Sequence, residues 1–151
     1  MAERQGPRVV VMGVSGSGKT TVGIPLAEAL EAEFCEGDDL HPSENRAKMS
    51  AGTPLDDDDR RPWLDKVATW LAEQDGPAVV SCSALKRSYR DRIRRTAPDA
   101  WFLHLDGDPQ LLAERQQARK GHFMPTSLMQ SQLDTLQPLG ADEAGLRLDV
   151  A

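Results

Sequence analysis

The stretch that decides the fold is Gly13-Val14-Ser15-Gly16-Ser17-Gly18-Lys19-Thr20, which follows the apolar run Val9-Val10-Val11-Met12 and precedes a segment with helical spacing. It matches the P-loop pattern of Gly, any four residues, Gly, Lys and then Ser or Thr. Its glycines permit the tight turns with positive φ that bring successive backbone N–H groups together around a phosphate. The stretch therefore predicts a binding loop for the phosphates of a nucleoside triphosphate.

Three features of this stretch set its expected chemistry. Lys19 supplies positive charge for the β and γ phosphates, Thr20 supplies a hydroxyl for Mg²⁺, and the start of the following helix adds a partial positive charge. The alternative is a glycine-rich turn that only joins a strand to a helix, and the completeness of the motif argues against it. We expect nucleotide contacts from Gly13, Ser15, Gly16, Ser17, Gly18, Lys19, Thr20 and Thr21, and we assign the metal only to Thr20.

Length and composition describe a single domain over residues 1–151. The chain is 39% hydrophobic and 28% charged, which is typical of a soluble globular protein. No apolar run approaches the roughly 20 residues that cross a bilayer, and no apolar signal segment precedes the first predicted strand, which favours the cytoplasm. The net charge of −6 argues against nucleic acid or an acidic membrane as a partner. Cys35 and Cys82 are expected to be small core residues.

Short apolar runs alternate with helix-like segments along the chain. Strands are predicted at 8–12, 34–35, 78–82, 101–105 and 146–150, and helices at 20–30, 41–50, 62–73, 108–120 and 126–136. This order predicts a three-layer α/β domain with a five-stranded parallel sheet. Ligands of such sheets lie at the carboxyl ends of the strands, so the P-loop and the segments 36–41, 81–86 and 106–108 should share one rim. The third strand ends without the acid that often helps to hold Mg²⁺; Asp106, after the fourth, is a possible substitute or part of a helix cap.

Two charged runs leave alternatives open. Residues 56–59 are consecutive aspartates, which we interpret as a solvated loop that favours the start of the next helix electrostatically. The segment 86–95 holds six Lys or Arg, which could bind RNA, form a solvated helix face or hold an anionic substrate. Because the whole chain is acidic and the segment follows a strand, we favour Lys86 and Arg90 pointing into the site, with the other cations solvated.

Two further sets of residues are candidates for catalysis. Asp38 follows the second strand, where a carboxylate would face the γ-phosphate across the rim, although Asp beside Gly is also an ordinary turn residue. Arg115 and Arg119 lie at i and i+4 near the end of a predicted helix, followed by Gly121 and His122. These arginines could clamp phosphate oxygens when a loop closes, or they could be solvated cations at a helix end.

Together these residues resemble the bacterial-type gluconokinases, which are small P-loop kinases similar in fold to shikimate and nucleoside-monophosphate kinases. The likeness covers nearly the whole chain. Its most specific part is the block from Gly37-Asp38-Asp39-Leu40-His41-Pro42 through Asn45, Lys48-Met49 and Pro54-Leu55 to Asp57, Asp59-Arg60 and Pro62-Trp63-Leu64. It continues through Cys82-Ser83-Ala84-Leu85-Lys86, Tyr89-Arg90-Asp91 and Ala118-Arg119-Lys120-Gly121-His122-Phe123.

The resemblance implies ATP- and Mg²⁺-dependent phosphorylation of the small molecule D-gluconate at its 6-hydroxyl. It implies that Asp38 orients the acceptor hydroxyl, that Lys19, Arg115 and Arg119 are catalytic, and that a small lid spans approximately 115–126. The acceptor-binding residues that it implies are Asp38, His41, Lys48, Arg60, Lys86, Arg90 and His122. A kinase of another small hydroxy acid, or a nucleotide-binding module without transfer activity, are the alternatives. Relatives generally continue beyond the last strand, near the adenine, and are often dimeric, so a partner subunit could cover that flank.

Overall fold

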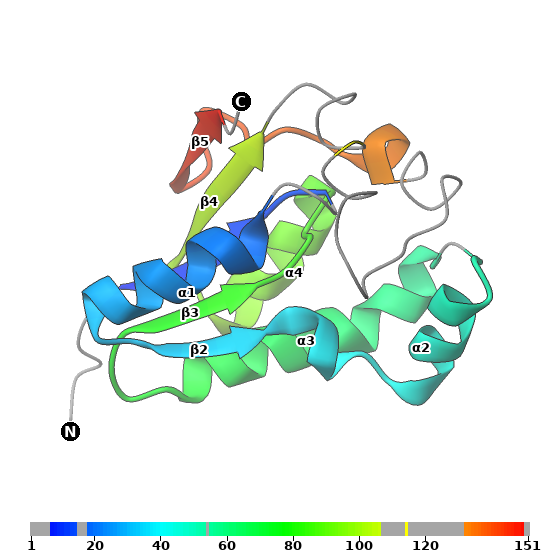
Figure 1. Ribbon diagram of the computed structural model, residues 1–151, viewed down its shortest axis with the longest axis horizontal. Coiled ribbons are helices and arrows are strands. Elements are labelled where there is room, and N and C mark those ends of the chain that lie inside the picture. The colour runs from blue at the N-terminus through cyan, green and yellow to red at the C-terminus, as the bar shows by residue number, and fades with distance from the viewer. Residues whose placement is uncertain (1–6, 15–17, 54, 107–113, 115–131, 150–151) are drawn as a thin grey trace.

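The computed structural model describes residues 7–14, 18–53, 55–106, 114 and 132–149 (Figure 1). In chain order its elements are β1 Arg8–Met12, α1 Lys19–Leu30, β2 Glu33–Glu36, the 3-10 helix η1 Gly37–Leu40, α2 Ser43–Ser50, α3 Asp57–Glu73, β3 Ala78–Ser81, α4 Arg87–Thr96, β4 Ala100–Asp106 and β5 Gly145–Asp149. The strands form one parallel sheet in the order β2-β3-β1-β4-β5. The predicted α/β class with a five-stranded parallel sheet is confirmed.

Helices cover both faces of the sheet, with α1 on one face and α3 and α4 on the other (Figure 1). The central strand β1 is buried along its whole length, which explains its apolar sequence without alternation. Alternate residues of β1 enter different cores: Val9 and Val11 pack towards α1, whereas Val10 and Met12 pack with α3 and α4. The two cores therefore bury β1 up to Met12, directly before the phosphate-binding loop.

Helix α3 starts earlier than predicted, because the aspartates at 56–59 form a helix start instead of a solvated loop. Asp56 is the N-cap residue, and its carboxylate accepts a hydrogen bond from the Asp59 N–H at 2.8 Å. The Asp59 carboxylate accepts in return from the Asp56 N–H at 3.0 Å, which completes a capping box. The helix consequently gains a first turn that carries Asp57, Asp59 and Arg60, and this turn forms part of the candidate site.

The strands and the helices α1 and α2 lie within a few residues of their predicted bounds, and β5 is shifted by one residue to Gly145–Asp149. Helix α4 and the short helix η1 were not predicted as elements. The predicted helix 108–120 and the lid at approximately 115–126 fall almost entirely outside the described residues. Of the predicted helix 126–136, residues 132–135 are helical in the described part. No helix in the described ranges is long and apolar enough to cross a membrane.

Candidate functional site

The phosphate-binding loop leads directly from β1 into α1. Gly18 adopts φ of 93°, a left-handed conformation that favours glycine, immediately before the first residue of α1. The Lys19 ammonium donates hydrogen bonds to the carbonyl oxygens of Gly13 at 3.0 Å and Val14 at 3.2 Å, so it lies against the backbone of the loop. Thr20 and Thr21 occupy the first turn of α1. The predicted residues Ser15, Gly16 and Ser17 fall outside the described residues.

Glu36 connects Thr20 to the end of β3. The Thr20 hydroxyl donates to Glu36 Oε2 and the Ser81 hydroxyl donates to Glu36 Oε1, each at 2.6 Å. The Gly37 N–H donates to Ser81 Oγ at 3.2 Å, and Glu36 is the register partner of Ser81 in the sheet. Glu36 was not among the predicted site residues. The available signal was its position as the last, charged residue of β2, next to the strand that lacks an acid.

The donors around Thr20 suit a small, hard cation. Carboxylate and hydroxyl oxygens are the ligands that Mg²⁺ prefers, and Mg²⁺ usually keeps waters and phosphate oxygens in its remaining positions. Within the part of the chain that the structure describes, no group of three or more His, Cys, Asp or Glu residues could hold a metal by itself. A divalent cation bound by these oxygens would take waters or phosphate oxygens in its remaining positions.

The turn after β2 brings Asp38 to the same rim. A Cβ on Gly37 would lie 1.9 Å from the Ser81 carbonyl oxygen, so only glycine allows the chain to pass this close to β3. The Trp63 indole fixes the turn by donating to the Gly37 carbonyl at 2.8 Å. Burial raises the pKa of the Cys82 thiol to about 12, and the charges of Asp38 and Lys19 also act on it, in opposite directions. Asp38 and Lys19 therefore both lie close enough to Cys82 for their charges to act on it, and Cys82 is a core residue as predicted.

His41 is buried against α3 in a neutral form. Its ring stacks on Trp63 with centroids 4.1 Å apart, and Asn45 Nδ2 lies 3.0 Å from His41 Nδ1. Burial, followed by the positive charges of Arg46 and Arg60, lowers the pKa of His41 to about 4. Because Asn45 Nδ2 is a donor, Nδ1 accepts and the ring proton lies on Nε2. His41 therefore contributes a neutral N–H donor and no charge near pH 7.

Lys48 and Asp59 join α2 to the first turn of α3. The Lys48 ammonium lies 2.9 and 2.7 Å from the two carboxylate oxygens of Asp59. This pairing raises the pKa of Lys48 and lowers that of Asp59. Asn45 strengthens the junction by donating to the Asp59 carbonyl at 2.8 Å.

Arg60 and Lys86 come together around Tyr89 and Asp57. Arg60 Nη1 donates to the Tyr89 hydroxyl at 2.7 Å, and that hydroxyl donates to Asp57 Oδ1 at 2.5 Å. The Lys86 ammonium lies 3.1 Å from the same Asp57 oxygen. Both cations also lie beside the Tyr89 ring, 5.3 Å from its centroid for Arg60 and 5.5 Å for Lys86. The structure thus brings together two predicted acceptor residues that are far apart in the sequence.

Arg90 does not point into the site, contrary to our expectation. Its side chain is fully buried and donates to both Glu143 carboxylate oxygens, from Nε at 2.8 Å and from Nη2 at 3.0 Å. Nη1 also donates to the Ala84 carbonyl at 2.9 Å. Arg90 lies on the face of α4 that turns towards the core, whereas Lys86 precedes the helix and stays at the rim. The functional assignment of Arg90 is therefore replaced by a structural one.

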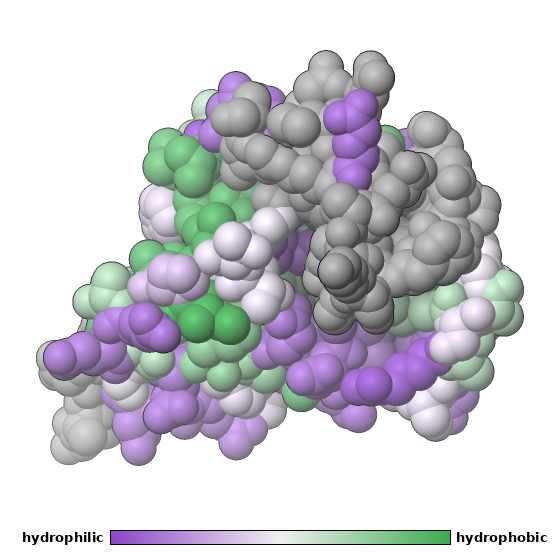
Figure 2. Space-filling view, in the orientation of Figure 1, coloured by the Kyte–Doolittle hydropathy of each residue, from purple (hydrophilic) through white to green (hydrophobic). Residues whose placement is uncertain are grey.

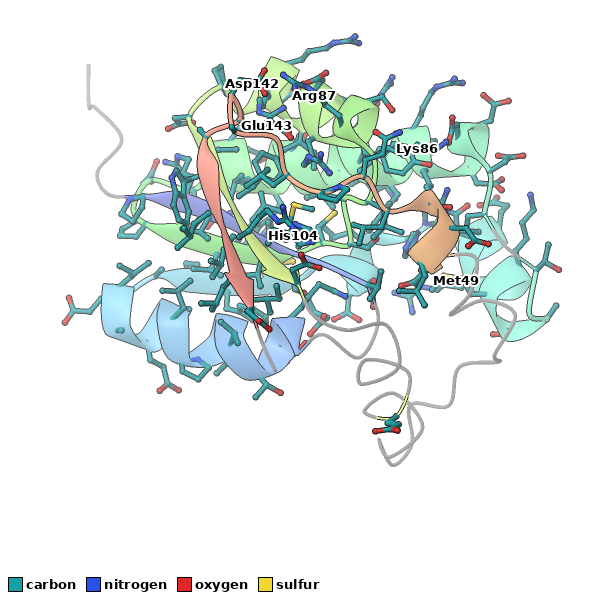
Figure 3. The ribbon with its side chains drawn as sticks, turned by 90° about the horizontal axis from the view of Figure 1, so that it is seen from above. Met49, Lys86, Arg87, His104, Asp142 and Glu143 are labelled. Carbon is teal, nitrogen blue, oxygen red and sulfur yellow. The ribbon has the colours of Figure 1, made fainter. Side chains whose placement is uncertain are left out.

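Three further arginines of α4, namely Arg87, Arg92 and Arg94, pair with acids of the same chain. Arg87 and Asp142 form an ion pair between the start of α4 and the segment before β5, beside Glu143 (Figure 3). Arg92 pairs with Asp65 of α3, and Arg94 pairs with Asp91 and Glu143. Arginines that are paired in this way present less free charge to an anion than unpaired arginines do.

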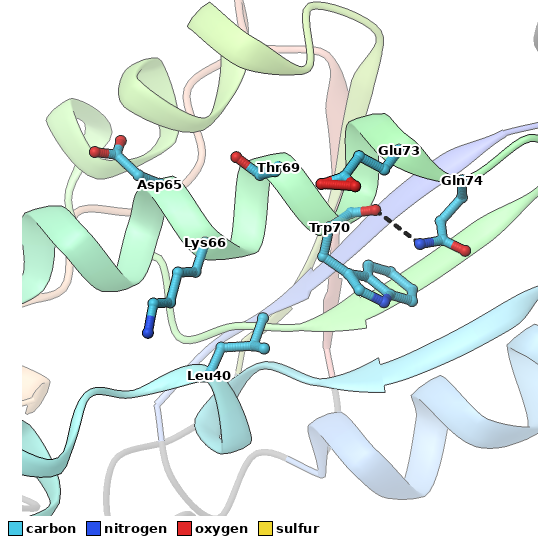
Figure 4. Close-up of a pocket in the computed structure, with 7 residues that line it drawn as sticks. All are labelled: Leu40, Asp65, Lys66, Thr69, Trp70, Glu73 and Gln74. Atoms are coloured by element: carbon cyan, nitrogen blue, oxygen red, sulfur yellow. Dashed lines mark hydrogen bonds between the residues drawn. The ribbon is translucent and has the colours of Figure 1, made fainter.

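The predicted lid residues Arg115, Arg119 and His122 fall outside the described residues. A separate hollow of about 370 Å³ lies between α3 and Leu40 of η1 (Figure 4). It is lined by Leu40, Asp65, Lys66, Thr69, Trp70, Glu73 and Gln74. It contains none of the residues that hold the phosphate-binding loop or the cluster around Tyr89, so we do not include it in the candidate site.

The fold and rim define a P-loop protein with a phosphate site at α1 and a second polar site formed by η1 and the start of α3. The AAA domain family matches this chain over residues 9–139. The thermosensitive gluconokinase of Escherichia coli (strain K12) is 46% identical over 149 residues, which cover 96% of this chain and 80% of that protein. The gluconokinase of Gluconobacter oxydans (strain 621H) is 52% identical over 143 residues, 93% of this chain and 80% of that protein.

A solved structure gives the same result. The gluconokinase from Sinorhizobium meliloti 1021 superposes with a TM-score of 0.90 at 53% identity, covering 99% of this chain and 85% of that one. The chain belongs to the gluconokinase family. The resemblance that rested on the block from Gly37 to Leu64 is thereby confirmed.

Proposed function

We propose that this protein transfers the γ-phosphoryl group of ATP to the 6-hydroxyl of D-gluconate. The observation that carries this proposal is the family relationship at 46% and 52% identity over nearly the whole chain, to proteins named gluconokinases. The rim supports it, because Lys19 and Thr20 lie at the phosphate loop and Asp38 lies on the adjacent turn. Phosphoryl transfer requires positioned groups and neutralised charge, which this arrangement supplies.

On the donor side, we infer that the loop residues Gly13 to Thr21 hold the phosphates. Lys19 would exchange its contacts with the Gly13 and Val14 carbonyls for phosphate oxygens, which are stronger, charged acceptors. Arg115 and Arg119 would add positive charge from the lid as negative charge develops on the leaving phosphate. His122 would contact the acceptor from the same lid.

We infer that the divalent cation is Mg²⁺, held by the Thr20 hydroxyl and supported by Glu36. Their oxygens, 2.6 Å apart, fit the oxygen ligands and partly hydrated coordination that Mg²⁺ requires. A cation there neutralises charge on the β and γ phosphates during transfer. Glu36 itself keeps the Thr20 hydroxyl oriented, because it accepts the hydroxyl proton and leaves the oxygen lone pairs available.

On the acceptor side, Asp38 accepts the proton of the attacking hydroxyl and orients its oxygen towards the γ-phosphate. The neutral His41 donates a hydrogen bond from Nε2 to a hydroxyl of the sugar acid. Lys48, on α2, is a second hydrogen-bond donor to the sugar acid. The His41–Trp63 stack and the Lys48–Asp59 pair hold these donors in place before the acceptor arrives. Such pre-organisation lowers the entropy cost of bringing two reactants into line.

A coupled assay of ADP release tests the proposal directly. The acceptors would be D-gluconate, other sugar acids, shikimate and nucleoside monophosphates, each with Mg²⁺ and ATP. We expect gluconate to give the highest kcat/KM. If another small hydroxy acid were the best acceptor, it would replace D-gluconate as the proposed substrate. If the protein bound ATP but released no ADP in response to any acceptor, it would be a nucleotide-binding module without transfer activity.

We also propose that two copies associate along β5. Figure 2 shows apolar side chains gathered over β5 and the adjoining part of the sheet, where Leu146 and Leu148 are 53% and 42% exposed. No described strand pairs with the outer edge of β5. Antiparallel pairing centred on Leu148 would join leucine to leucine and place Arg147 opposite Asp149 of the partner subunit, so the strand complements itself.

Light scattering on size-exclusion fractions tests this association. The wild-type protein should have twice the mass of a monomer. The Leu148→Lys variant should have the mass of a single monomer. Glu33→Lys on β2, the opposite edge strand, is the control and should leave the mass unchanged. A wild-type protein of monomer mass would exclude the pairing.

A further inference from the structure

We propose that Asp57 and Tyr89 are positioning residues for a carboxylate-binding subsite whose cations are Arg60 and Lys86. The inference rests on the proposed function, and it assigns the charged end of the acceptor to one corner of the rim. Its basis is a continuous set of hydrogen bonds from Arg60 through the Tyr89 hydroxyl to Asp57 and on to Lys86.

Arg60 presents an unused edge. It donates from Nη1 to Tyr89, and within the described ranges its Nε and Nη2 donate to no acceptor. Arg60 as a residue is partly exposed. A planar pair of N–H donors matches the two oxygens of a carboxylate, which it binds in bidentate fashion. The hydrogen bond at Nη1 and the Tyr89 ring therefore fix the orientation in which Arg60 meets an anion.

Tyr89 can hold Arg60 only while its hydroxyl proton points elsewhere. A hydroxyl has one proton to donate, and Asp57 Oδ1 accepts it at 2.5 Å. The hydrogen bonds from Tyr89 and Lys86 lower the pKa of Asp57, so its carboxylate stays ionised and accepts. The lone pairs of the Tyr89 hydroxyl are consequently left for Arg60. Tyr89 is 4% exposed, so water does not readily substitute for it.

The charges of the cluster select the acceptor class. Arg60 and Lys86 carry two positive charges and Asp57 carries one negative charge, which leaves a balance of one positive charge. This balance suits an acceptor with a single carboxylate and gives no advantage to a neutral polyol. The subsite therefore discriminates sugar acids from sugars and sugar alcohols of the same length.

The test compares Tyr89→Phe with the control Asp65→Asn, which breaks the exposed Arg92–Asp65 link between the same two helices. The readouts are kcat and KM for D-gluconate, KM for ATP, and the inhibition constant of D-gluconamide, which keeps every hydroxyl but has no charge. For Tyr89→Phe we expect KM for gluconate to rise about tenfold, with kcat, KM for ATP and the gluconamide constant changing less than threefold. Asp65→Asn should match the wild type.

Two outcomes would overturn the proposal: an unchanged KM for gluconate, or equal losses for gluconate and gluconamide. Asp57→Asn provides a second variant at an exposed position, where a folding defect is not expected. It should also raise KM for gluconate, because an amide can donate to Tyr89 and release Arg60. A fall in KM would contradict positioning, since it would mean that Asp57 only competes with the substrate. If wild-type protein gave no gluconate-dependent turnover, the proposed function itself would fail instead.

Discussion

Arg90 and Glu143 form an ion pair in which neither side chain is exposed, with Arg90 Nε 2.8 Å from Glu143 Oε1. Burial alone would raise the pKa of Glu143, but hydrogen bonds from Arg90, the Gly140 N–H and Arg94 lower it to about 2. Glu143 lies just before β5 and Arg90 lies in α4. The pair therefore attaches the segment before β5 to α4. Its contribution is structural, and it can be measured.

Glu143→Ala should lower the free energy of unfolding by about 3–5 kcal/mol, because it leaves the buried Arg90 guanidinium without a counter-charge. The measurement is urea denaturation at pH 7. Asp142→Ala removes the adjacent but exposed partner of Arg87 and should cost less than about 1 kcal/mol. Equal losses in the two variants would contradict the structural role of the buried pair.

The buried pair also shows why part of the site was beyond sequence reasoning. Lys86 and Arg90 have the same spacing as two residues on one helix face, and their chemistry is similar. They differ because Lys86 precedes α4, whereas Arg90 shares the buried face with Ile93 and meets an acid 53 positions away. Only the folded chain brings that partner to Arg90.

Glu36→Gln should raise the Mg²⁺ concentration for half-maximal activity about tenfold or more. The reason is that a neutral amide replaces the negatively charged carboxylate beside Thr20. Binding of ATP without metal should change little. The assay is a magnesium titration of the initial rate at saturating ATP and gluconate. Glu33→Gln, an exposed change on the same strand, is the control. An unaltered magnesium dependence would exclude Glu36 from the metal site.

Asp38→Asn should lower kcat by a factor on the order of 10²–10⁴, the usual range for removing a positioned general base. The Kd for ATP, measured by calorimetry, should stay within about threefold, because Asp38 acts on the acceptor. Asp39→Asn changes the neighbouring carboxylate and should retain most of the activity. A parallel loss of ATP affinity and turnover would place Asp38 on the donor side instead.

Acid should destabilise the protein through His41. Its pKa is about 4 in the folded protein and about 6.5 when unfolded, so the unfolded state binds the proton more readily. The contribution of His41 to the free energy of unfolding is therefore fully present above about pH 6.5. As the pH falls towards 4, the free energy of unfolding decreases by up to about 3 kcal/mol. Urea denaturation between pH 4.5 and 7 should show a shallower pH dependence in His41→Gln than in the wild type. Identical slopes would refute the contribution of His41.

The sequence predicted the parallel sheet and the position of the loop between β1 and α1 well, because both depend on local signals. The apolar run of β1 and the glycines of the loop carry their own conformational preferences. The missed features depend on contacts between strands and helices. The carboxylate beside Thr20 comes from the end of β2 and not from the end of β3 or β4. The aspartates at 56–59 become a helix start through the reciprocal hydrogen bonds of Asp56 and Asp59.

The position of the transferred phosphate tests the proposed reaction directly. Purified protein would be incubated with ATP, Mg²⁺ and D-gluconate, and the product would be examined by phosphorus and proton NMR. We predict one phosphomonoester whose phosphorus couples to the protons on C6, formed in equal amounts with ADP. ADP without a sugar phosphate, or a phosphate on another carbon, would contradict this prediction.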